Sequence, residues 1–94
     1  MLDAIKVTVT AAHIADAKPY PNSSPIALAL RDLGFGDACV TKSYAYCGDK
    51  VYTIPEQAIA LERCFNHLVG IGATKEKIAE NINPSTFELV ELVQ

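Results

Sequence analysis

The first segment of the chain alternates between apolar and polar side chains. In residues 4–10, Ile5, Val7 and Val9 are each followed by a lysine or a threonine. A period of two is typical of a strand with one buried and one solvated face. The threonine that ends the segment favours the N-cap position of a helix. We therefore expect a strand over 4–10, followed by a short helical turn over 11–15.

Two later segments have the apolar spacing of helices. Ser24 is a favoured N-cap, Pro25 fits the first helical position, and Gly34 is a suitable stop, so a helix is predicted over 25–33. A second helix is predicted over 55–69. The residues expected to face the core are Ile26, Leu30 and Leu33 in the first helix, and Ala58, Leu61, Cys64, Phe65 and Leu68 in the second. The outer side of the second helix is expected to carry Glu62, Arg63, Asn66 and His67.

Between these helices, residues 38–47 and 50–54 have the composition of two strands. Gly48-Asp49 joins them, and glycine at the first central position suits a two-residue type II′ hairpin. This register places Tyr46 opposite Val51, with Tyr44 on the same face. Cys47, Ala45, Tyr52 and Ile54 would then share the opposite face.

A short helix over 74–81 and a last strand over 87–93 complete the predicted order, β-α-β-β-α-(α)-β. The economical fold for this order is one α+β domain over residues 1–94. It has two layers, a four-stranded, mostly antiparallel sheet with two helices on one face, and the short extra helix before the last strand. A ferredoxin-like arrangement is one such fold, and other strand orders stay open. The last strand is apolar on both faces, so helices are expected to cover one side and a partner subunit the other.

Composition narrows the function classes. The 94 residues carry a net charge of −3, and the eight basic residues are scattered, which disfavours nucleic-acid binding. Residues 1–10 lack the basic start and the apolar run of a signal peptide, so we expect none. No apolar run in the sequence approaches the ~20 residues that span a bilayer, so we also expect no membrane association. Three cysteines at wide spacings indicate free thiols in a reducing cytoplasm.

We find no set of residues with the spacing of a catalytic or metal site. His13 and His67 are expected in different elements, and Cys64 falls on the predicted core side of its helix, where nothing activates the thiol. The glutamates match no acid–base or metal motif. We therefore expect no catalytic residues, no metal and no cofactor, and predict that the protein is not an enzyme.

Two segments are candidates for binding. Asn22, Ser23 and Ser24 precede a predicted helix whose free N–H groups and dipole favour a small anionic ligand. Tyr44 and Tyr46, with Val51 opposite Tyr46, form a candidate association face, because tyrosine gives a large contact area at low entropic cost. The alternative for the tyrosines is ordinary packing within a strand.

Several short pieces resemble a group of small uncharacterised proteins of tailed bacteriophages and prophages. In that group an opening strand leads to a turn ending in His-Ile, and a Pro-Ile-Ala-Leu-Ala-Leu helix, strands, a Leu-Pro helix start and a Phe-rich last strand follow. The matching pieces here are Thr-Ala-Ala-His-Ile (10–14), Ser-Pro-Ile-Ala-Leu-Ala-Leu (24–30), Ile-Pro (54–55) and Phe-Glu-Leu (87–89). The resemblance touches most of the chain and implies a phage setting.

The chain departs from this group at two points. Ser24 stands where members often carry cysteine, and Phe65-Asn66 stands where they tend to have Phe-Asp, so a thiol or carboxylate role does not transfer. The leading hypothesis is a non-enzymatic phage-type binding protein in the host cytoplasm. It would blunt a host defence by occupying a protein surface, or hold a small anionic ligand, as a homo-oligomer or on a host protein. The alternative is a structural or assembly accessory protein without a ligand, and a small enzyme without a recognisable motif comes third.

Overall fold

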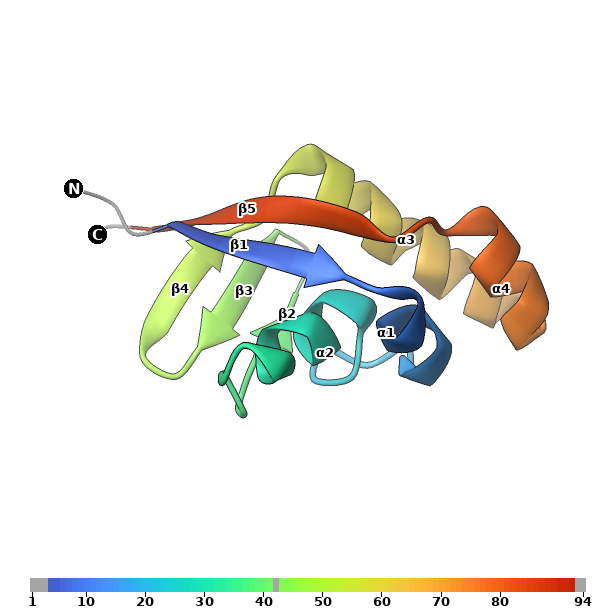
Figure 1. Cartoon of the computed structure of the whole chain (residues 1–94), viewed down its shortest axis with the longest axis horizontal. Helices are drawn as coiled ribbons and strands as arrows, with labels where there is room; N and C mark the ends of the chain where they lie inside the picture. Colours follow the sequence, from blue (N-terminus) through green and yellow to red (C-terminus); the bar gives the residue numbers. More distant parts are fainter. Residues whose placement is uncertain (1–3, 42, 93–94) are drawn as a thin grey trace.

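A computed structural model describes residues 4–41 and 43–92 of the chain. Its strands are β1 (Ala4–Val9), β2 (Cys39–Val40), β3 (Tyr44–Cys47), β4 (Lys50–Thr53) and β5 (Ser85–Glu91), and its helices are α1 (Ala11–Asp16), α2 (Pro25–Asp32), α3 (Glu56–Gly70) and α4 (Lys75–Asn81). Figure 1 shows β1 and β5 side by side along the molecule, with α2 below this pair in the view and α3 running behind β5. The two helices contact each other.

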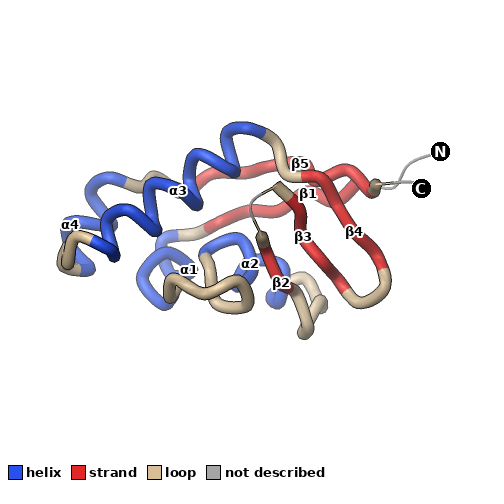
Figure 2. Tube along the Cα trace, turned by 180° about the vertical axis from the view of Figure 1, so that it is seen from behind, coloured by secondary structure: helices blue, strands red, loops and turns tan. Residues whose placement is uncertain are grey.

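All neighbouring strands are antiparallel, in the order β1-β5-β4-β3-β2. β1 pairs with β5 from Ala4↔Val90 to Val9↔Ser85, whereas β4 pairs with only the end of β5, at Thr53↔Val90 and Tyr52↔Glu91. The sheet therefore curls strongly, and β4, β3 and β2 turn away from the β1–β5 ribbon (Figure 2). α2 contacts both edge strands, β1 and β2, and so spans the open side of the curl.

The prediction of four strands is wrong, because residues 38–47 form two strands. β2 folds back onto β3, with Cys39 opposite Tyr46 and Val40 opposite Ala45. The three residues between the strands are all polar, and the turn closes with the Thr41 N–H donating to the Tyr44 carbonyl at 2.8 Å. A ferredoxin-like order is not formed either, since β1 lies at the sheet edge, with β5 as its neighbour in the described ranges. The α+β class and the antiparallel pairing are confirmed.

The hydrophobic core is one cluster on the inner side of the curl. Leu30 of α2 and Phe65 of α3, at the centres of their predicted stripes, are 0% and 1% exposed. Leu33 is 51% exposed, and its predicted core position is wrong because α2 ends at Asp32 and Leu33 is already the C-cap. Glu62, predicted to face water, is partly buried, with its Oε2 atom inaccessible to solvent, and the reason lies in its contact with α2, described below.

Local sequence signals behave as expected at the helix starts and at the hairpin. The Ala27 N–H donates to the Ser24 hydroxyl at 3.3 Å, which caps α2. Gly48 has φ +64°, as the first central residue of a type II′ turn requires, and the predicted register of β3 and β4 is confirmed, with Tyr46 opposite Val51. β5 begins at Ser85, before the predicted start at Phe87.

β5 has an asymmetric environment. Phe87 and Leu89 are buried in the core, whereas Val90, on the other face, is only half-buried. In the part of the chain that the structure describes, no helix has the length and apolar character needed to cross a membrane.

Candidate functional site

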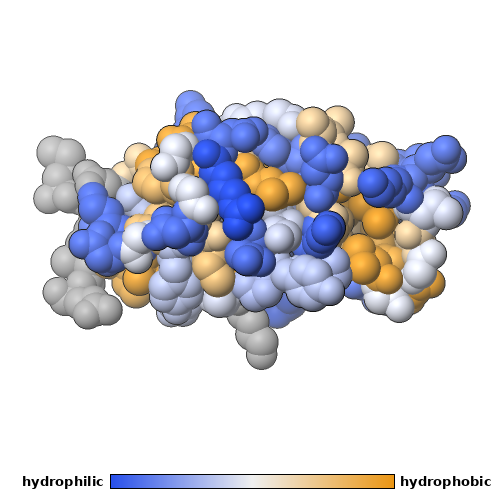
Figure 3. Space-filling model, turned by 90° about the horizontal axis from the view of Figure 1, so that it is seen from below, coloured by the Kyte–Doolittle hydropathy of each residue, from blue (hydrophilic) through white to orange (hydrophobic). Residues whose placement is uncertain are grey.

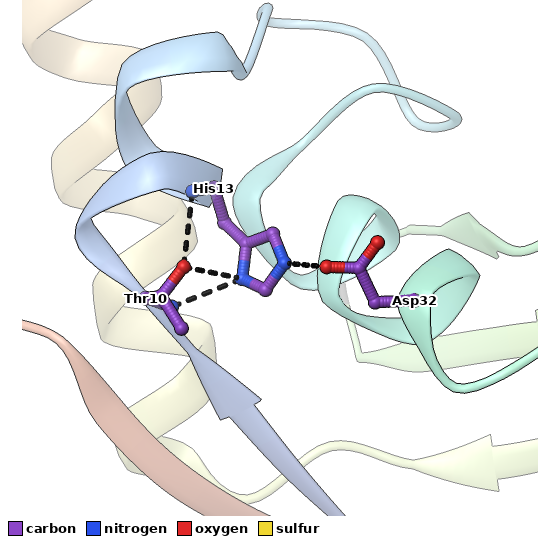
Figure 4. Close-up of polar contacts among 3 residues, drawn as sticks. All are labelled: Thr10, His13 and Asp32. Carbon is purple, nitrogen blue, oxygen red and sulfur yellow. Dashed lines mark hydrogen bonds and ion pairs between the residues drawn. The ribbon is translucent and has the colours of Figure 1, made fainter.

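The first polar cluster joins the start of α1 to the end of α2 (Figure 4). Thr10 and His13 form a capping box: the Thr10 N–H donates to His13 Nδ1 at 3.0 Å, and the His13 N–H donates to the Thr10 hydroxyl at 3.3 Å. The other ring nitrogen, Nε2, contacts the Asp32 carboxylate. With Nδ1 accepting the backbone N–H, the ring proton lies on Nε2 and is donated to Asp32.

This threonine–histidine–aspartate order resembles that of a hydrolytic triad, but the hydrogen bonds assign it a structural role. A base must have a free lone pair for the nucleophile's proton, and here His13 Nδ1 accepts from the Thr10 N–H. The Thr10 hydroxyl in turn caps α1. The cluster therefore fixes the position of α1 against α2.

The second candidate is a pocket of about 550 Å³ between three elements. One wall is the loop between α1 and α2, another is the end of β2, and the third is α3; in Figure 2 the loop and β2 are seen below α3. The loop is held in shape by its own backbone, since the Lys18 N–H donates to the Ser23 carbonyl at 2.8 Å, and it is tied to β2 by the Val40 N–H, which donates to the Pro21 carbonyl at 2.8 Å.

Glu62 is the unusual residue of this pocket. Its burial raises the pKa of the carboxyl group from 4.5 to about 7, while hydrogen bonding from the Ser24 side chain and the Ile26 backbone opposes the rise. Its Oε2 atom is buried and has no hydrogen-bond partner among the described residues. Near neutral pH the group therefore exchanges between the acid and the carboxylate.

The position of Glu62 bears directly on the predicted anion site. Ser24 is 6% exposed and caps α2, while Asn22 is exposed and accepts from the Ser23 hydroxyl at 3.3 Å. The carboxyl group of Glu62 lies at the start of α2, where the helix dipole favours negative charge. A ligand anion at this point would meet that carboxyl group, so the helix start favours a ligand that donates hydrogen bonds to it.

The third candidate is the outer sheet face, which is turned away from the core. Its apolar half consists of Tyr44, Tyr46, Val51, Thr53, Val90 and Leu92, and its polar half consists of Lys6, Thr8, Thr86 and Glu88. Tyr44 and Tyr46 are 39% and 41% exposed. The structure thus places all three residues of the predicted association face on one surface, outside the core cluster.

The surfaces of the molecule differ in how their hydrophobic residues are distributed. The face shown in Figure 3 carries separate hydrophobic patches set among hydrophilic residues. The outer sheet face differs, because its register brings aromatic and branched side chains together on adjacent strands.

The cysteines are a further group of candidate residues. All three are free, as predicted. Burial, and then the charge of Asp37, raise the pKa of the Cys47 thiol, which favours the unreactive protonated form. Within residues 4–41 and 43–92, no three His, Cys, Asp or Glu side chains are grouped so that they could hold a metal ion.

No family model, no curated protein and no solved structure matches this chain. The resemblance to phage proteins therefore stays a prediction.

Sequence reasoning missed Glu62. It stands four residues after Ala58 and three before Phe65, and these spacings place it beside the core stripe of α3. This spacing is the sequence signal from which the partial burial of Glu62 could have been predicted. The packing of α2 against α3, which buries Glu62, depends on the tertiary structure and is not visible in the sequence.

Proposed function

We propose that this protein is a non-enzymatic binding protein that self-associates through the outer sheet face. The observation that carries the proposal is the half-exposure of Tyr44 and Tyr46 beside Val51, Val90 and Leu92 on one surface. In the phage setting that the resemblance predicts, the same face would serve to occupy a host protein. Three free thiols favour a cytoplasmic location.

The composition of the face supports a second copy as its first partner. Protein interfaces have apolar, aromatic-rich centres and polar rims, and tyrosine is common among the residues that dominate binding. A two-fold interface must be self-complementary. Lys6 and Glu88 supply both signs of charge on the polar half, so a two-fold contact can place the lysine of one copy near the glutamate of the other.

Among the described residues, the roles of the threonine–histidine–aspartate cluster and of the buried thiol support the non-enzymatic part. Thr10, His13 and Asp32 use their hydrogen-bonding groups to hold α1 and α2. Cys47 is buried and its thiol is held in the protonated form.

Sedimentation of the Tyr44→Ser/Tyr46→Ser variant tests the proposal. We expect the parent to form a dimer over micromolar to millimolar concentrations, and the serine variant to stay monomeric with an unchanged circular dichroism spectrum. The matched control is Tyr44→Phe/Tyr46→Phe, which keeps the aromatic area and should keep the dimer. A parent that is monomeric throughout this range, or a serine variant that dimerises as well as the parent, would show that the face is not an association surface.

A further inference from the structure

The pocket beside α3 has the size of a small-molecule site. Sites for small ligands and cofactors span roughly 300–1,000 Å³, and this one measures about 550 Å³. Its lining combines an aromatic ring, a carboxyl group and a guanidinium group, from Tyr20, Glu62 and Arg63. Such a set can recognise three different parts of one ligand.

The carboxyl group of Glu62 selects a ligand that donates hydrogen bonds. Its Oε2 atom is buried without a partner among the described residues, and a buried acceptor left unpaired lowers stability. Two adjacent N–H groups on a planar ligand match the two oxygens of a carboxylate. A ligand with two such donors would turn the carboxyl group away from Ser24 and Ile26 toward the pocket, and the broad terminal torsion of glutamate allows this.

The other walls select a ring and an anionic group. Tyr20 is 60% exposed and lines the pocket with Pro21 and Ile59, which together offer surface for a flat ring. Nucleobases stack favourably on aromatic side chains of this kind. Arg63 follows Glu62 on α3, is exposed, and makes no ion pair within the described ranges, so its guanidinium is available to an anion.

We infer that this pocket binds a guanine nucleotide, with its adjacent ring N–H and amino groups on Glu62, its base against Tyr20 and its phosphate on Arg63. Guanine has the required pair of adjacent donors, whereas adenine presents an acceptor at the ring position that should face the carboxylate. The inference does not depend on self-association, because the outer sheet face and the pocket share no residues.

Proton linkage follows from the same geometry. A carboxylate accepts both donors, whereas the protonated acid cannot, so guanosine should bind more tightly as Glu62 ionises. Burial raises the pKa of Glu62 to about 7, and Arg63 is the other charged group lining the pocket among the described residues. The affinity for guanosine should therefore rise about tenfold from pH 6 to pH 8.

Calorimetric titration with GMP, AMP and guanosine tests the inference. We expect the parent to bind GMP at least tenfold more tightly than AMP, and Glu62→Gln to abolish this preference while leaving AMP binding unchanged. Arg63→Gln should weaken the binding of GMP but leave the binding of guanosine unchanged, because guanosine has no phosphate. Glu88→Gln, which alters an exposed carboxyl group of the outer sheet face, is the matched control and should bind as the parent does.

Three results would overturn the inference. They are no saturable binding of GMP by the parent at millimolar concentration, equal affinities of the parent for GMP and AMP, or equal losses of GMP affinity in Glu62→Gln and Glu88→Gln. If Glu62→Gln does not fold, Tyr20→Ala takes its place. Tyr20 lies outside the core, so this variant should fold and should lose affinity for guanosine. Unchanged guanosine affinity in Tyr20→Ala would also refute the site.

Discussion

Replacing Glu62 with glutamine should change the pH dependence of stability. Glutamine keeps the shape and the acceptor oxygen of the side chain but does not ionise. In the folded protein, burial against α2 raises the pKa of Glu62 from 4.5 to about 7. The variant therefore removes one titration that differs between the folded and unfolded states.

The sign of the effect follows from proton binding. In the unfolded chain Glu62 loses its proton near pH 4.5, whereas the folded protein keeps it until about pH 7. Between these values the folded state binds more protons, so the free energy of unfolding falls as the pH rises. The stabilising contribution is fully present below pH 4.5 and is lost by about pH 7. At about 1.4 kcal/mol per pH unit, the loss is about 3 kcal/mol in order of magnitude.

Urea unfolding at pH 4.5, 6, 7 and 8 measures this difference. We expect the stability of the parent, relative to Glu62→Gln, to fall by about 3 kcal/mol between pH 4.5 and pH 8. Glu80→Gln, on the exposed side of α4, is the control and should give a pH profile parallel to that of the parent. Parallel profiles for the parent and Glu62→Gln would mean that Glu62 is solvated and that its burial against α2 is wrong.

Three further results are expected. Phe65→Ala should lower the free energy of unfolding by roughly 3–5 kcal/mol, whereas Leu33→Ala, at a half-exposed position, should change it by less than about 1 kcal/mol; equal losses in urea titrations would place the core elsewhere. Gly48→Ala should destabilise the hairpin by about 1 kcal/mol, because φ is +64° at this position. Gly70→Ala should instead raise the melting temperature, because Gly70 lies at the end of α3 and an added Cβ would meet open space. A reducing agent should leave the melting temperature unchanged, because the three thiols are free, and a large fall in a thermal scan would reveal a disulfide.

The parts of the fold that local signals determine could be predicted. Thr10 and Ser24 each cap a helix through the side chain, and Gly48 sets the hairpin register, because these effects involve residues a few positions apart. The break between β2 and β3 was missed, because residues 38–47 were predicted as one strand from their composition. The break falls at the polar residues beside Thr41. Their backbone instead closes a turn onto Tyr44.

The sheet order and the pocket could not be predicted, because both depend on contacts between distant segments. β1 pairs with β5, although most of the sequence lies between them, and neither strand has a sequence feature that identifies the other as its partner. Tyr20, in the loop before α2, and Glu62, in α3, meet only because α2 packs against α3 and β2 returns to the loop at Pro21. The candidate association face was accessible to sequence reasoning for the opposite reason: Tyr44, Tyr46 and Val51 lie within one hairpin.

The stability and binding experiments on Glu62 together decide why the chain carries a carboxyl group at this position. As a partner for the start of α2, glutamine would accept the same hydrogen bonds from Ser24 and Ile26 without the cost of a buried charge at neutral pH. Functional sites commonly retain groups that lower stability, because the chemistry needs them. If Glu62→Gln is more stable than the parent at pH 8 and also loses the preference for GMP, the carboxyl group is kept for recognition. If the variant is more stable and binds GMP as the parent does, the group acts only in the packing of α2 on α3.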